Sequence, residues 1–216
     1  YGQPLHAFDR DLLAGKKIIM RRAKKGEPFA SLDGTELKLE PDALVIADGE
    51  KPVALAGIMG GTKSQVSETT CHIVLESACF DPATVRKESK KYGLRSDSSY
   101  RFERGVDWNS VVSAQARAVL MMKELAGGEI CSGRVDINPE TGKSKSVSLR
   151  VSRLNQLLGA SFNAAQIRDL LSRLGMEVAN QSENMEVKIP SFRPDLSREV
   201  DLIEEIARID GFDKVD

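Results

Sequence analysis

The stretch that decides the fold of the first part of the chain is residues 28–39, PFASLDGTELKL. Asp33-Gly34 stands between two short segments with apolar residues. This dipeptide is the strongest short-range signal for a β-hairpin, since glycine accepts the backbone conformation of the tight turn. Further strands are predicted on either side, over 16–23 (KKIIMRRA), 43–49 (ALVIADG), 51–58 (KPVALAGI) and 72–78 (HIVLESA).

Helices follow these strands. Asp81-Pro82 predicts a helix start, with a capping carboxylate and a proline at the first helical position. A longer helix is expected from Asp107 to the stop at Gly127-Gly128. Its apolar residues on one face are Val111, Val112, Ala116, Val119 and Leu120. Residues 133–137 (GRVDI) are compatible with a closing strand.

A second unit is predicted beyond residues 138–146 (NPETGKSKS), which are polar and rich in turn formers. The order there is strand, helix, helix, strand, helix. Ser152 is expected to cap a short helix that ends at Gly159, and Asn163 with Gln166 resembles a capping box. The last helix is expected over roughly 197–210. We therefore predict an α+β protein, with a mixed sheet and flanking helices followed by a winged-helix-like module.

Composition excludes several classes of protein. The chain has 31 basic and 32 acidic residues, so it lacks the basic footprint of an autonomous nucleic-acid binder. Its three cysteines form no CxxC pair, which argues against a zinc site or a disulfide framework and fits a reducing compartment. No apolar run approaches the ~20 residues of a membrane span, and no signal peptide is evident. Because the chain begins with Tyr1 and stops after a helix-like segment, we expect a piece of a longer protein.

The glycine-rich segment 57–64, GIMGGTKS, is similar to a phosphate-binding loop. Thr62 stands where that loop needs its second glycine, and no apolar helix pattern follows, so nucleotide binding here is not predicted. A glycine turn between strands is one interpretation. Another is that Gly57, Gly60 and Gly61 let a ligand approach bare backbone.

Two polar residues stand out against apolar surroundings. His6, in PLHAF, has the features of a packed histidine as much as those of a functional one. Glu76 lies in IVLESACF, where an unpaired buried carboxylate would be costly. Spacing leaves open whether Glu76 faces solvent or lines a pocket.

Two charged segments have alternative interpretations. YGLRSDSSYRFERGVD (92–107) is either a solvated loop or a source of hydroxyl donors to a ligand. On the last helix, Asp201, Glu204 and Glu205 share one face, and Asp195 precedes it. Ordinary solvated acids, with a Glu204–Arg208 ion pair, are the simpler explanation. Hard-cation binding by oxygen ligands is the other.

Several of these segments occur in the order typical of one family. The chain resembles the β chain of bacterial phenylalanyl-tRNA synthetase over nearly its whole length. The motifs that carry the resemblance are GQPLHAFD (2–9), LDGTE (32–36), VIAD (45–48), GIMGG (57–61), LESACFDP (75–82), YGLRSDSSYRFERGVD (92–107) and SFRPDLSREVDLIEEIARIDGF (191–212). The resemblance implies an editing domain over 1–140, formed by the family's third and fourth modules, a linker over 141–146 and the fifth module over 147–216.

The resemblance also implies a reaction. An apolar pocket cannot strongly reject a near-isostere that only adds a hydroxyl, so a synthetase for phenylalanine needs a second site that hydrolyses Tyr-tRNA(Phe). Glu76 takes the family position that accepts the phenol hydrogen, and His6 that of the editing-site histidine. The implied catalytic residues are His6, Glu76 and Ser96, and the implied substrate-binding residues are Gly57, Gly60 and Ser98. Ser96 replaces a frequent threonine, and Ser98 stands where some relatives have alanine.

The second unit is implied to contact the α subunit of an α2β2 heterotetramer. Its implied Mg²⁺ ligands, shared with that subunit, are Asp195, Asp201, Glu204 and Glu205. ATP would be used by the whole enzyme and not bound here, and the location would be cytoplasmic. The expected partners are the α subunit, tRNA(Phe) and tyrosine, with no membrane. The rival hypothesis is a non-catalytic module that binds nucleic acid or serves as a scaffold.

Overall fold

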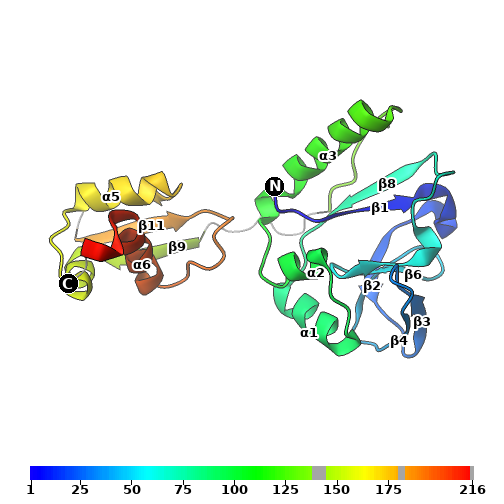
Figure 1. The fold of residues 1–216 in the computed structure, drawn as a ribbon, viewed down its shortest axis with the longest axis horizontal. Helices are drawn as coiled ribbons and strands as arrows, with labels where there is room; N and C mark the ends of the chain where they lie inside the picture. Colours follow the sequence, from blue (N-terminus) through cyan, green and yellow to red (C-terminus); the bar gives the residue numbers. More distant parts are fainter. Residues whose placement is uncertain (138–144, 180–182, 215–216) are drawn as a thin grey trace. The chain divides into compact units, whose positions relative to one another are not determined.

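The computed structural model describes residues 1–137, 145–179 and 183–214. It divides into two compact units, Tyr1–Val135 and Asp136–Asp216 (Figure 1). Both units combine helices with strands, which confirms the predicted α+β class. The strand pairs of the described residues are antiparallel throughout. Most of the predicted boundary segment, residues 138–144, lies outside the described residues.

Three small sheets build the first unit. The largest has the order β2-β5-β6-β7, and the other two are the pairs β3-β4 and β1-β8. The strands are β1 (Leu5–Asp9), β2 (Ile19–Arg22), β3 (Glu27–Ala30), β4 (Glu36–Leu39), β5 (Leu44–Ala47), β6 (Pro52–Leu55), β7 (Met59–Gly60) and β8 (Ile73–Ser77). The predicted hairpin is β3-β4, and Gly34 in its turn has φ 87°. The short strands end where polar or glycine residues interrupt each apolar segment, as the sequence predicts.

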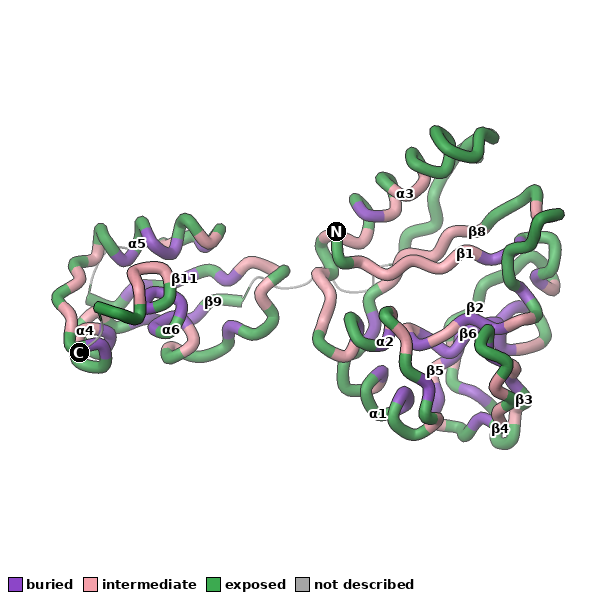
Figure 2. Tube along the Cα trace, viewed as in Figure 1, coloured by how far each residue is buried: buried purple, intermediate pink, exposed green. Residues whose placement is uncertain are grey.

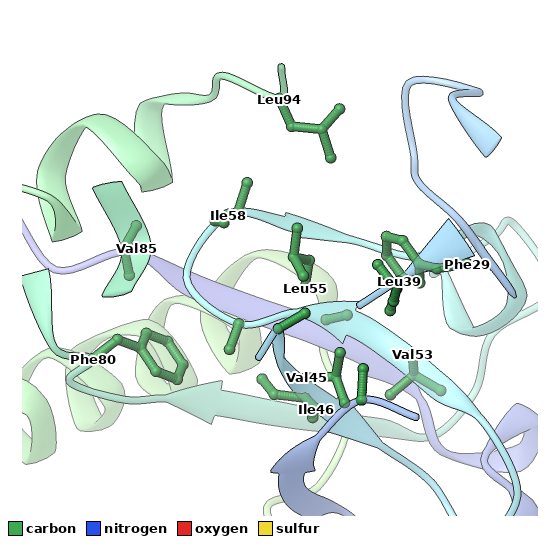
Figure 3. Close-up of a cluster of buried hydrophobic side chains, with 14 of the residues drawn as sticks. Phe29, Leu39, Val45, Ile46, Val53, Leu55, Ile58, Phe80, Val85 and Leu94 are labelled. Carbon is green, nitrogen blue, oxygen red and sulfur yellow. The ribbon is translucent and has the colours of Figure 1, made fainter. Parts of the chain in front are cut away.

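The core of the first unit forms around β5 and β6. Val45, Ile46 and Leu55 are buried there and pack with Phe80 and Val85 from the segment that follows β8 (Figure 3). Figure 2 shows the same concentration of buried residues along β5. Burying side chains of this size stabilises the fold by roughly 1.5–3 kcal/mol each. Core residues Ile46, Leu55 and Phe80 also line the cavity of the candidate site described below.

Of the α-helices in the first unit, the first begins where the sequence predicts, the second lies in a segment for which no helix was predicted, and the third begins at Val111 instead of Asp107. In α1 (Pro82–Tyr92), the Asp81 carboxylate accepts the backbone N–H of Thr84. The shorter α2 (Asp97–Phe102) follows, and then α3 (Val111–Ala126), after a 3₁₀ turn at Trp108–Ser110.

Helix α3 is tied to strand β8 at its first turns. The Ser77 hydroxyl donates to the Val111 carbonyl at 2.8 Å, and the Gln115 side chain donates to Leu75 at 3.0 Å. The apolar face predicted for α3 is not buried along its length, since Leu120 is 49% exposed. The suggested strand at 133–137 is wrong, because these residues carry no strand and Val135 is exposed.

The second unit follows the predicted order of strand, helix, helix, strand and helix, except that two strands stand where the second single strand was predicted. Strand β9 (Lys145–Arg150) is followed by α4 (Val151–Leu158), α5 (Ala164–Arg173), β10 (Glu177–Val178), β11 (Asn184–Ile189) and α6 (Glu199–Asp210). The sheet order is β10-β11-β9. Asn163 and Gln166 form the predicted capping box. The predicted Ser152 cap is wrong: α4 starts at Val151, and the Ser152 N–H binds the Glu183 carboxylate at 2.8 Å.

Among the described helices, none has the length and apolar character needed to cross a membrane. The three cysteines, Cys71, Cys79 and Cys131, are exposed and free.

Candidate functional site

The candidate site begins with a cross-strand pair. In the antiparallel pairing of β1 with β8, His6 lies directly opposite Glu76. Directly opposed residues project from the same face of a sheet, with Cβ atoms about 4.5–5.5 Å apart. The pairing therefore brings together two polar side chains that are 70 residues apart in the sequence.

A cavity of about 200 Å³ lies on this face. Its walls include all six residues that the sequence assigned to a substrate site, namely His6, Gly57, Gly60, Glu76, Ser96 and Ser98. They come from β1, β7, β8, α2 and the turn after β6. Five separate segments thus converge on one hollow, with apolar walls from residues such as Phe80 and Phe102.

Two buried polar atoms in this cavity wall are unsatisfied. His6 Nε2 and Glu76 Oε2 have no hydrogen-bond partner among the described residues. A buried polar atom left unpaired costs about 1–3 kcal/mol, so such atoms are expected where a ligand or water completes the bonding. The cavity is thus equipped with an acceptor and an imidazole nitrogen that the fold itself does not use.

Burial also shifts the protonation of these two residues. Loss of solvation raises the pKa of Glu76 to about 7. The same cause lowers the pKa of His6, whose ring also packs edge-on against Phe8 with centroids 4.5 Å apart. At neutral pH the imidazole is therefore neutral, and Glu76 exchanges between its neutral and charged forms.

Gly60 is required by the position of His6. A Cβ at Gly60 would lie 2.3 Å from His6 Cε1 and 2.6 Å from Nε2. Gly57 is required by both conformation and packing: its φ is +70°, and a Cβ there would lie 2.8 Å from the Phe80 ring. The two glycines are therefore required for different reasons. Gly60 leaves room for the imidazole, and Gly57 allows the turn that packs against the core.

In the serine-rich segment 92–107, the two predicted site residues Ser96 and Ser98 both bind the backbone of the glycine turn. The Ser96 hydroxyl donates to the Ile58 carbonyl at 2.5 Å and accepts the Ser99 N–H, so it caps α2. The Ser98 hydroxyl donates to the Gly57 carbonyl at 3.1 Å. In this structure both hydroxyl hydrogens bind backbone and are not offered to a ligand. Their contribution is to hold α2 against the glycine turn.

Sequence reasoning missed several residues of the cavity wall. Leu32, at the tip of the β3-β4 hairpin, closes one side, and its backbone N–H donates to the Gly60 carbonyl at 3.0 Å. Pro4 and Leu5 form another side. The available signal for Leu32 was an apolar residue beside an Asp-Gly turn, where a polar residue is usual.

The phosphate-loop-like segment 57–64 has no phosphate-loop geometry. Thr62–Ser64 forms only a three-residue 3₁₀ turn, and an extended segment follows. The helix amino terminus that a phosphate loop requires is missing from this part of the described chain. The segment is therefore a glycine turn followed by a short 3₁₀ turn, and not a phosphate loop.

Of the four predicted Mg²⁺ ligands, Asp195, Asp201 and Glu205 are already engaged, and only Glu204 has no hydrogen bond or ion pair among the described residues. Arg193 Nη2 lies 2.6 Å from Asp195 and 2.8 Å from Glu205. Arg208 pairs with Glu205, so the expected Glu204–Arg208 ion pair is wrong. Asp201 accepts the backbone N–H groups of Ser197 and Arg198, which lowers its pKa to about 2.

These carboxylates suit Mg²⁺ in donor type but not in arrangement. Within the described ranges, no three His, Cys, Asp or Glu residues come together as a metal-binding group. Arg193 stands between two of the four predicted ligands and supplies the positive charge that a metal ion would supply. This unit alone therefore does not fit a magnesium ion.

Comparisons with known proteins agree with this division of the chain. Residues 1–127 match the family model of the B3/4 domain, and residues 147–212 match that of the tRNA synthetase B5 domain. The phenylalanine–tRNA ligase β subunit of Geobacter metallireducens is 46% identical over 216 residues, which is 100% of this chain and 27% of that protein. The same subunit of Moorella thermoacetica is 46% identical over 99% of this chain and 26% of its own length. The chain thus spans about a quarter of the length of these relatives.

A solved structure has a similar fold. The crystal structure of an N-terminal fragment of the phenylalanyl-tRNA synthetase β subunit from Pyrococcus horikoshii aligns with a TM-score of 0.50. The alignment covers 96% of this chain and 59% of that fragment at 18% identity. At this identity the likeness concerns the fold alone.

Proposed function

Because the chain belongs to the phenylalanine–tRNA ligase β-subunit family and carries its B3/4 and B5 domains, we propose that its first unit hydrolyses tyrosine wrongly attached to tRNA(Phe). The observation that supports this most directly is the 200 Å³ cavity, with His6 and Glu76 opposed across β1 and β8 and each with an unpaired buried atom. It offers an apolar volume for a ring together with an acceptor for a hydroxyl.

Glu76 is the proposed selectivity residue. When tyrosine enters, its phenol O–H donates to the carboxylate and satisfies an atom that is otherwise unpaired. Phenylalanine brings no donor and removes water from the carboxylate as well. The cavity therefore favours tyrosine over phenylalanine. An apolar aminoacylation site cannot strongly reject tyrosine, because rejecting an added hydroxyl requires a polar partner that recognises it.

His6 is the proposed positioning residue for hydrolysis. Water attacks the ester carbonyl, the bond to the ribose oxygen breaks, and the products are free tyrosine and tRNA(Phe) with its hydroxyl restored. The neutral imidazole accepts a hydrogen bond from that water or from the substrate amino group and holds it in line. Orientation of this kind supplies a large part of the rate for an already activated ester. Gly60 keeps the space that the imidazole needs.

Ser96 and Ser98 support the site through the backbone. Their hydroxyls hold α2 to the carbonyls of Ile58 and Gly57 and so fix the glycine turn that lines the pocket. We assign Ser96 a positioning role in place of the catalytic role that the resemblance implied.

We propose that the second unit contacts the α subunit of an α2β2 enzyme and that any Mg²⁺ bound there is shared. Arg193 neutralises Asp195 and Glu205 in this chain, so metal binding requires a rearrangement or further ligands. Aminoacylation, with its use of ATP, would belong to the complete enzyme and not to this segment. The proposed setting is the cytoplasm, where tRNA(Phe) is charged.

Binding of free amino acids tests the pocket without RNA. Calorimetry should show tyrosine binding more tightly than phenylalanine, and the preference should grow about fivefold from pH 6 to pH 8 as Glu76 ionises, because bonds to charged groups are stronger by about 1 kcal/mol. Glu76→Gln should lose the pH dependence, whereas Glu50→Gln, an exposed control outside the cavity, should retain it. Equal affinities at both pH values would favour the rival scaffold function.

A further inference from the structure

A second cavity adjoins the first. Its volume is about 380 Å³, and it is lined by Gly2, Gln3, Pro4, Leu5, Asp97, Ser98 and Arg101. Three of these residues, Pro4, Leu5 and Ser98, also line the first cavity, which contains His6 and Glu76. The two hollows therefore share a wall, made by the start of β1 and the first turn of α2.

This second cavity contains one acid and one base that are not paired. Asp97 and Arg101 are four residues apart on α2, a spacing at which opposite charges commonly meet. No hydrogen bond or ion pair joins their side chains to each other or to another described residue. Both are exposed, and a Cβ at Gly2 would lie 3.7 Å from Arg101 Nη1, so bare backbone also lies next to the guanidinium.

The wall between the cavities is held in place by Gln3. Its side-chain amide donates to the Ala78 carbonyl at 2.7 Å and to the Pro4 carbonyl at 3.0 Å. The bond to Ala78 joins the segment before β1 to the residue that follows β8, two positions after Glu76. Gln3 is therefore a positioning residue for the boundary that both hollows share.

From this geometry we propose that the second cavity binds the terminal nucleotide of the aminoacylated RNA. The inference rests on the proposed function, since an ester whose acyl group fills the first cavity must place its ribose immediately outside it. Arg101 pairs with the phosphate that precedes the terminal nucleoside, as guanidinium groups do at RNA backbones. Asp97 accepts a hydrogen bond from the free ribose hydroxyl, which marks the substrate as RNA.

Non-hydrolysable conjugates test this assignment. The probes are L-tyrosinamide and 3′-(L-tyrosylamino)-3′-deoxyadenosine with and without a 5′-phosphate, titrated into the 216-residue chain. The conjugates should bind at least tenfold more tightly than tyrosinamide. The 5′-phosphate should add about fivefold in low salt and much less in high salt, because an exposed ion pair is screened.

Variants separate the two parts of the nucleotide. Arg101→Ala should abolish the gain from the 5′-phosphate, while Arg86→Ala, an exposed arginine on α1 that lines neither cavity, should keep it. Asp97→Asn should weaken both conjugates and leave tyrosinamide binding unchanged. Circular dichroism confirms that each variant is folded.

The outcomes distinguish this inference from the proposed function. If tyrosinamide binds in a Glu76-dependent way but the conjugates bind no more tightly, the nucleotide lies elsewhere and the tyrosine pocket stands. If the phosphate gain survives Arg101→Ala, the role of Arg101 is refuted. If neither tyrosinamide nor a conjugate binds, both proposals are wrong.

Discussion

His6 and Glu76 face each other across the antiparallel pair β1-β8, and each has a buried atom at the same cavity that finds no hydrogen-bond partner in the described part of the chain. The fold gains nothing from these two atoms, since leaving them unpaired costs about 1–3 kcal/mol each. Such an arrangement is typical of a site in which a ligand completes the hydrogen bonding.

The two pocket glycines should respond differently to alanine. Gly60→Ala places a methyl group against His6 and should impair Tyr-tRNA(Phe) hydrolysis more than stability. Gly57→Ala combines positive φ with contact to Phe80, so it should cost about 2–4 kcal/mol of unfolding free energy. Gly26→Ala is the control, with φ +71° and nothing within 4 Å, and should cost only about 1 kcal/mol. Urea denaturation measures all three, and equal costs for Gly57→Ala and Gly26→Ala would contradict the packing argument.

The two serines should differ in stability. Ser96→Ala removes a helix cap and a bond to Ile58, so the free energy of unfolding should fall by about 1–2 kcal/mol. Ser98→Ala removes one bond of 3.1 Å and should cost less than about 1 kcal/mol. Thermal unfolding of both variants tests this order. A smaller loss for Ser96→Ala than for Ser98→Ala would mean that the cap does not hold α2.

Stability should fall as pH rises through the titration of Glu76. The folded pKa is about 7 and the ordinary value is 4.5, so between these values the folded state holds a proton that the unfolded state has released. The wild-type free energy of unfolding should therefore drop by about 1–3 kcal/mol relative to Glu76→Gln from pH 4.5 to pH 7 and stay level above that. Denaturation curves across this range measure the difference. A constant difference would mean that Glu76 is solvated normally.

Arg193 should stabilise the second unit in place of a metal ion. Arg193→Gln leaves the exposed Asp195 without this partner and the buried Glu205 with Arg208 alone, and it should cost about 1–3 kcal/mol. Arg198→Gln removes a guanidinium that is 74% exposed and pairs with Asp201, so it should cost under about 1 kcal/mol. Low-millimolar Mg²⁺ should leave the wild-type Tm unchanged and raise that of Arg193→Gln. A clear rise in the wild-type Tm would show that this chain holds the metal unaided.

The sequence predicted the strands and helix starts with strong local signals. Asp33-Gly34 fixed the hairpin, and Asp81 and Asn163 fixed two helix starts, because caps and tight turns depend on neighbouring residues. The predicted cap at Ser152 was wrong because the helix starts one residue earlier, at Val151. The carboxylate of Glu183, distant in sequence, accepts the backbone N–H of Ser152 in the first turn. The strand at 133–137 failed because a short apolar pattern forms a strand only where another strand is available to pair with it.

The candidate site was predictable in part. Spacing alone left His6 and Glu76 undecided, because the register of β1 against β8 is a long-range property. The family resemblance named the six residues that the structure brings to one cavity. It did not reveal that the hydroxyls of Ser96 and Ser98 are bound to carbonyls, nor that Arg193 neutralises the acids of α6. Those depend on side-chain contacts that no local pattern encodes.

Single-turnover hydrolysis of Tyr-tRNA(Phe), compared with Phe-tRNA(Phe), tests the central claim most directly. The chain should clear the tyrosyl ester faster than the phenylalanyl ester. His6→Ala should slow the tyrosyl reaction by about 10- to 1,000-fold while tyrosine remains preferred. Glu76→Ala should instead reduce the preference toward unity. If the wild-type chain leaves Tyr-tRNA(Phe) intact, or if both variants match its rate and selectivity, the His6–Glu76 pair is not an editing site.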